Sequence, residues 1–212
     1  MSLNDSSEQY VLPVNGLNST GPFEFQFLPI RDTVLAMDKL VMLLRAEVYD
    51  ANNETYEPLS DITSINFLLS TLFRSIECRV NSVPLNLSAS QHTAYKSIMQ
   101  AYTSVDANSA ANLLPSLYTP ESSATSSTSM TPAENDSTRT RQKFLNLGGG
   151  QFELCGPVTG VDFLMSDAYL APFNTLSLTF TRHDDEFIFN TPKITPPTDE
   201  EIEVIYKDKY VC

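Results

Sequence analysis

The chain has 212 residues, of which 42% are hydrophobic and 18% charged, a composition typical of a globular protein and not of a disordered one. Its formal net charge of −13 produces a field that repels nucleic acid and anionic lipid, and no run of lysine and arginine reverses this charge locally. We therefore expect no direct binding to nucleic acid.

The cysteines and the first residues bear on where the protein assembles. Cys78, Cys155 and Cys212 lie far apart without a C-x-x-C pair, and the first two occupy positions predicted to face inward. Residues 1–9 are polar and acidic, unlike a signal peptide, and no run approaches 18 apolar residues. We expect reduced thiols, assembly inside the cell and no membrane span.

The N-terminal part of the chain predicts an arm followed by two strands. Residues 1–20 are polar, and we expect an N-terminal arm that orders only against a partner. In residues 23–27, three phenylalanines alternate with polar residues, which predicts a strand with one buried aromatic face. Residues 40–49 are apolar on both faces at first and alternate later, so this strand is more deeply covered at one end.

Residues 61–102 carry the strongest pattern, a strand between two helices. Apolar residues recur every three or four positions from Ile62 to Phe73, which predicts a helix. The period changes to two over residues 76–80, which predicts a half-buried strand, and the turn sequence of residues 81–84 ends it. A second amphipathic helix follows, and its apolar side comprises Ala94, Tyr95, Ile98, Met99 and Tyr102.

Residues 119–142 form the clearest low-complexity segment. Ser, Thr, Pro and Asn dominate it, so it has too little apolar surface to offset the entropy of ordering. We expect a long, exposed surface loop inside the domain. Because strand patterning resumes after this loop without a complete set of elements before it, we predict a single domain over residues 21–212.

The last third of the chain returns to period-two alternation. The predicted strands lie at residues 152–155, 161–165, 176–181, 187–189 and 202–206. A polar turn at residues 182–185 precedes the fourth of these. The whole chain thus contains about eight strands, two helices and no βαβ alternation. This pattern predicts a mainly β protein, an antiparallel eight-stranded jelly-roll sandwich with two short helices in the loops between strands.

Motifs that would carry chemistry are weak. The only histidines, His92 and His183, lie beside neither a G-x-S-x-G elbow nor a Cys-His pattern, and His92 is expected on an exposed helix side. Residues 183–186 (HDDE) could bind a hard cation, but they depart from the calcium-loop pattern, which favours a solvated turn. We predict no enzymatic activity and no catalytic, cofactor-binding or metal site.

Two further segments suggest other kinds of site. Residues 148–150 (GGG) lack the G-K-[ST] ending of a phosphate-binding loop and precede a strand pattern, so a flexible turn is favoured. Arg139, Arg141 and Lys143 form the only basic cluster, on the predicted loop. Three charges on such a loop more often meet acidic protein surface than nucleic acid.

The order of four blocks is informative: PFEFQFLP, LVMLLRAEVYD, INFLLSTLFRSIECRVNSVPLN and HTAYKSIMQAY. It resembles the capsid proteins of Polinton/Maverick elements and adintovirus-like viruses, in which a helix, an alternating strand, a turn and a tyrosine-containing helix follow one another. A later block, residues 152–189, is similar to the family's strands ending in an Arg-x-x-Asp-x-Phe turn, here Arg182, Asp185 and Phe187. The resemblance covers residues 22–206.

The resemblance implies a jelly-roll virion protein, a capsid subunit of a double-stranded DNA virus that is assembled inside the host cell. Its partners would be copies of itself and other capsid proteins, and closed symmetry favours a trimeric or pentameric homo-oligomer. Proteins of this family generally continue into a second, similar half, so the resemblance implies either a single jelly roll of the same lineage or the first half of a double one.

Two other classes of function stay open. One is a β-sandwich binding module for carbohydrate or receptor attachment, although the absence of Trp disfavours an aromatic platform. The other is a cation-dependent hydrolase built on Asp184, Asp185 and Glu186.

Overall fold

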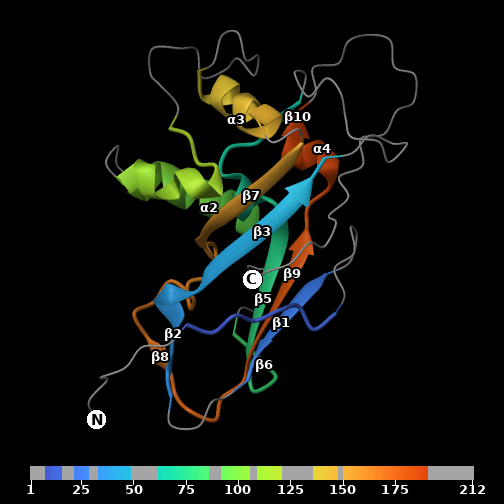
Figure 1. Ribbon diagram of the computed structural model, residues 1–212. Coiled ribbons are helices and arrows are strands. Elements are labelled where there is room, and N and C mark those ends of the chain that lie inside the picture. Colours follow the sequence, from blue (N-terminus) through green and yellow to red (C-terminus); the bar gives the residue numbers. More distant parts are fainter. Residues whose placement is uncertain are drawn as a thin grey trace.

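The computed structural model describes residues 8–15, 22–28, 33–48, 62–85, 92–105, 109–120, 136–147 and 150–190 (Figure 1). About a third of these residues are helical, about a third lie in strands, and each strand pairing among them is antiparallel. The chain is therefore a mixed α and β protein with antiparallel sheets, and it contains more helix than the mainly β prediction allowed.

The largest sheet is built around β9. In the order β1-β9-β5-β6, its strands are β1 (Phe23–Phe27), β9 (Leu176–Arg182), β5 (Phe73–Val80) and β6 (Val83–Pro84). Phe180 lies in β9 opposite Phe23 on one side and Ile76 on the other, and all three are buried. Apolar residues alternate with polar ones along these strands, so one face of the sheet meets the core. The strands predicted at residues 23–27, 76–80 and 176–181 are confirmed.

A second layer contains two long strands, β3 (Val41–Glu47) and β7 (Gln151–Pro157), which pair along all seven residues of each. Figure 1 shows this pair crossing in front of β5 and β9. Ala46, Phe152 and Leu154 belong to the same buried core cluster as Phe180, so one core joins the two layers. The strands predicted at residues 40–49 and 152–155 are confirmed.

Two short strand pairs flank the layers. They are β2 (Leu35–Ala36) with β8 (Tyr169–Leu170), and β4 (Thr63–Ser64) with β10 (Phe189–Asn190). The long strands pair in a nested order. β1 pairs with β9, and the two strands β3 and β7, which lie between them in sequence, pair with each other.

The helices lie between the strands in sequence. They are η1 (Met37–Lys39), α1 (Leu68–Thr71), α2 (Thr93–Ser104), η4 (Ser109–Ser116), α3 (Asp136–Leu147) and α4 (Asp185–Ile188). The second predicted helix is confirmed as α2. No helix in the described ranges has the length and apolarity needed to cross a membrane.

The first predicted helix, from Ile62 to Phe73, is wrong over most of its length. Its start pairs as β4, and only the four residues of α1 are helical. The residue before α1, Phe67, has a left-handed backbone with φ of 60°, which ends the extended conformation and begins the helix abruptly. The three- and four-residue spacing of apolar residues arises because strand, turn and helix all face the same core.

Residues 119–142 are not a loop throughout, which corrects the prediction. Thr119 is buried and residues 136–142 form the first half of α3; residues 121–135 lie outside the described part of the chain. One side of α3 is buried, and the residues on it, which recur with helical spacing, are Ser137, Thr138, Arg141 and Leu145. Because three of these are polar, a search for apolar periodicity could not detect the helix.

Other expectations also need correction. Residues 161–165 form a turn instead of a strand, although Val161 and Leu164 still reach the core. Residues 187–189 contain the end of α4 before β10 begins. Cys78 is buried as predicted, and burial raises the pKa of its thiol to about 11, whereas Cys155 lies exposed on the outer face of β7.

Part of the predicted N-terminal arm packs on its own chain. Pro13 forms an isolated bridge with Phe25, and the amide of Val14 donates to the carbonyl of Glu24 at 2.7 Å. This part of the arm therefore lies against β1 of its own chain. The predictions for a strand at residues 202–206 and for one domain over residues 21–212 depend on residues 191–212, which lie outside the described ranges.

Candidate functional site

The HDDE segment, considered for cation binding, forms the beginning of α4. Asp184 is the residue before the helix, and Asp185 and Glu186 lie in its first turn. The Asp185 carboxylate forms an ion pair with the Arg182 guanidinium, so this carboxylate is neutralised by its neighbour. Within the described ranges, no group of three or more His, Cys, Asp and Glu side chains is placed to hold a metal ion.

His183 is held by its backbone and by an aromatic ring. Its amide donates to the carbonyl of Leu72 at 2.8 Å, and its ring stacks on Phe187 with centroids 3.8 Å apart. Burial lowers the pKa of His183 below its ordinary value of 6.5. Asp184 opposes this effect by a smaller amount, and Arg74 lowers the pKa slightly further. The imidazole is therefore neutral near pH 7.

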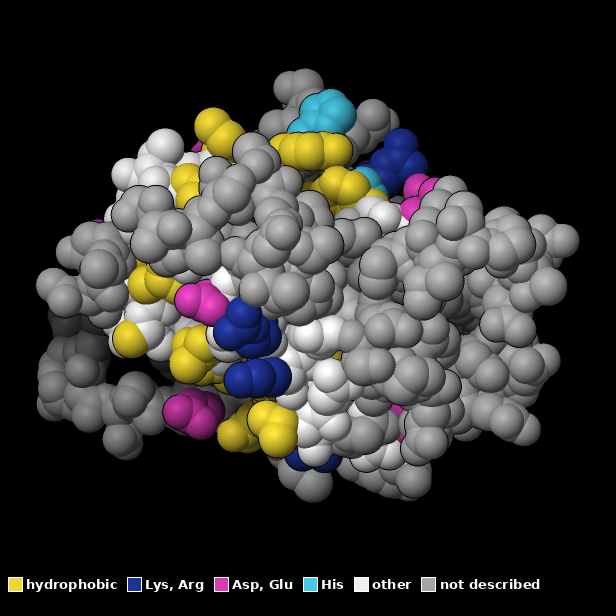
Figure 2. Space-filling view, turned by 90° about the horizontal axis from the view of Figure 1, so that it is seen from above, with side chains coloured by type: hydrophobic (Ala, Val, Ile, Leu, Met, Phe, Trp, Pro, Cys, Tyr) yellow, Lys and Arg dark blue, Asp and Glu magenta, His cyan; other side chains and the backbone are white. Residues whose placement is uncertain are grey.

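Both histidines of the chain lie at the ends of one aromatic row. His92, exposed as predicted, has its ring 6.3 Å from Tyr95, and Tyr95 lies 5.6 Å from Phe187, on which His183 stacks. Figure 2 shows the cyan histidines beside yellow hydrophobic side chains on this face of the molecule. The row joins the first turn of α2 to α4, which are far apart in sequence.

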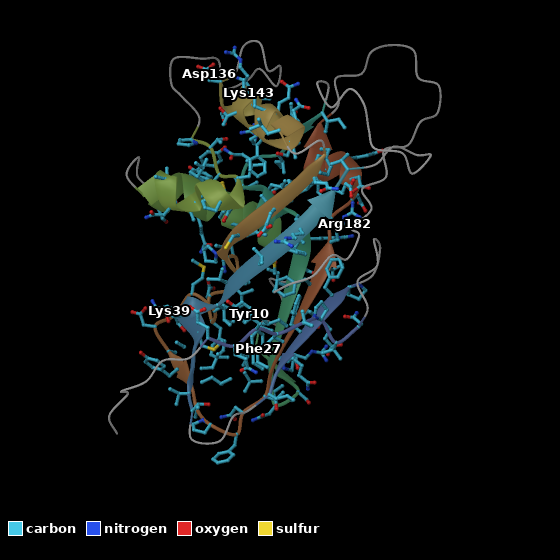
Figure 3. All side chains as sticks on the ribbon, in the orientation of Figure 1. Tyr10, Phe27, Lys39, Asp136, Lys143 and Arg182 are labelled. Atoms are coloured by element: carbon cyan, nitrogen blue, oxygen red, sulfur yellow. The ribbon has the colours of Figure 1, made fainter. Side chains whose placement is uncertain are left out.

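The predicted basic cluster is divided by the fold. Arg139 and Lys143 are exposed, and Figure 3 shows Lys143 on α3 together with Asp136. Arg141 is only 3% exposed. Its Nε donates to the carbonyl of Ser64 at 2.9 Å. The guanidinium also donates to the hydroxyl groups of Thr119, Ser137 and Thr138.

Arg141 belongs to a buried polar cluster that joins three parts of the chain. Asn66 donates to the Thr119 carbonyl at 2.7 Å and accepts from the Thr119 amide at 2.9 Å. The hydroxyls of Thr119 and Ser137 lie 2.6 Å apart. These contacts attach α3 to β4 and to residue 119, so the buried Arg141 helps to hold these three parts of the fold together.

A small cavity lies between the layers. It has a volume of about 10 Å³ and is lined by residues that include Met42, Ser70, Phe73, Thr159 and Phe180. A space of this size holds about one water molecule. It is therefore a packing gap and not a substrate pocket.

The exposed face of α2 is apolar. Tyr95, Met99 and Tyr102 are 54%, 62% and 50% exposed, although the sequence placed them together with Ala94 and Ile98 on one amphipathic side. The buried residues of this helix are small: Thr93, Ala94, Ser97 and Ala101. The prediction of a helix is right, but the face that meets the core differs from the one that the apolar pattern indicated.

A second exposed apolar row lies on the segment beside β1. Tyr10, Leu12 and Val14 alternate along it and are all exposed, while Val11 and Pro13 are half-buried. Figure 3 labels Tyr10 on this segment. The period of two in residues 10–14 is visible in the sequence and indicates an extended segment, which the prediction of an arm over residues 1–20 does not include.

The described part of the chain thus exposes two apolar surfaces. Large side chains such as those of Tyr95, Met99 and Leu12 lose water-exposed apolar area only by contact with another molecule. The candidate functional site is therefore a pair of contact surfaces, one on α2 and one on residues 10–14.

Comparison with known proteins identifies no relative. No family model matches the chain, no curated protein is significantly similar to it in sequence, and no solved structure matches it significantly.

Proposed function

We propose that the chain is a jelly-roll capsid subunit of a double-stranded DNA virus, a structural protein without enzymatic activity. It assembles with copies of itself into trimeric or pentameric capsomers and with other capsid proteins into a virion formed inside the host cell. This proposal joins the resemblance of its sequence blocks to Polinton/Maverick and adintovirus-like capsid proteins with the arrangement of its strands.

The nested strand pairing is the observation that carries the proposal. A jelly roll is a long antiparallel hairpin rolled into two facing sheets, so early strands pair with late ones. β1 pairs with β9, and β3 pairs with β7, in this nested order. β5 lies next to β9 in the first sheet, and β3 and β7 are in the facing layer. This order supports a jelly roll more than a simple meander.

The exposed apolar rows provide independent support. A monomeric protein seldom exposes adjacent large apolar side chains, whereas a subunit that packs into a shell must do so. Tyr10, Leu12 and Val14 form such a row next to an edge of the main sheet, since β1 is the first strand in its order. A contact here would bring neighbouring subunits together at the wall of the sandwich.

The decisive experiment is a measurement of assembly by the full chain. We expect light scattering and electron microscopy to show rings of three or five copies at high protein concentration. Leu12→Asp should weaken ring formation at least about tenfold, because a charge buried at an interface is poorly solvated. Thr140→Asp adds the same charge at an exposed position of α3, outside this row, and should leave assembly unchanged.

Two results would contradict the proposal. One is a chain that stays monomeric at high concentration over a range of pH and salt. The other is a monomer that binds glycans on an array, which would favour the β-sandwich binding module instead. Melting temperatures of both variants should match that of the unmodified chain, which separates loss of assembly from loss of folding.

A further inference from the structure

We draw no further inference here: the strongest candidate, the exposed apolar face of α2 that comprises Tyr95, Met99 and Tyr102, supports no proposal because nothing in the structure shows what covers it.

Discussion

α2 and α3 are helices of twelve residues each, and they use their two faces in opposite ways. α3 buries a charged side chain, Arg141, and exposes other charged residues such as Arg139 and Lys143. α2 buries small residues and exposes Met99 together with its two tyrosines. The comparison shows that the side of a helix that meets the core is not set by hydrophobicity alone.

Different contacts decide the orientation of each helix. For α3, the guanidinium of Arg141 is buried because carbonyl and hydroxyl oxygens surround it, including those of Ser64 and Thr119. For α2, the close approach of the loop at Gly160 leaves room only for small side chains. Gly160 itself has a φ of +84°, which an L-residue rarely adopts. Local sequence therefore determines that each segment is helical, and its neighbours determine its orientation.

The strongest test of the α3 half of this comparison is Arg141→Met. It removes the donors that satisfy several buried oxygens, and we expect the free energy of unfolding to fall by about 3 kcal/mol. The matched variant Arg139→Met, two residues away but exposed, should change it by less than about 0.5 kcal/mol. Chemical denaturation monitored by circular dichroism measures both. Equal effects would mean that Arg141 does not anchor the helix.

For α2, Ala101→Leu probes the face that is filled by small residues. Ala101 is buried against Phe67 and Tyr118, so the larger side chain would overpack this cluster and cost about 2 kcal/mol of unfolding free energy. Met99→Leu on the opposite face should cost less than about 0.5 kcal/mol in the monomer, because residue 99 is exposed. Urea titrations at low protein concentration keep association from contributing. A reversed order of the two effects would contradict the orientation of α2.

The smallest effect concerns pH and involves His183, which stacks on Phe187 beside Tyr95 of α2. Burial lowers the pKa of His183 from its ordinary 6.5, so the unfolded chain binds more protons than the folded one at mildly acidic pH. This contribution to stability is present above pH 6.5 and is lost as the pH falls through the lowered pKa of the folded state. His183→Asn should therefore make the unfolding free energy less dependent on pH between 7 and 5.5.

A proton titration of the His183 imidazole by NMR would report its pKa directly, and a value above 6.5 would contradict the expectation.

Much of the sheet could be predicted from sequence. Where one face of a strand is buried, as in residues 23–27 and 176–181, strict alternation of apolar and polar residues results, and it is readable without a structure. The same reasoning found α2. Periodicity gave the wrong element for residues 161–165, which form a turn although Val161 and Leu164 are buried. It also missed α3, because the buried side of that helix is mostly polar.

The contact surfaces were harder to predict than the fold. The pattern Tyr95, Met99 and Tyr102 was recognised, but an apolar helical stripe most often faces the core, and nothing local distinguishes a stripe that faces solvent. Likewise, the three basic residues looked alike in sequence, and only the surrounding oxygens separate Arg141 from Arg139.

The sequence by itself determined the character of the segments: where strands alternate, where α2 forms, and that the chain is acidic and globular. These properties depend on neighbours within a few positions, so local periodicity contains them. The tertiary structure alone decided which strands pair, such as β1 with β9, and which face of each helix is buried. Those outcomes depend on space and hydrogen-bond partners supplied by residues far away in the chain, such as Gly160 for α2 and Ser64 for α3.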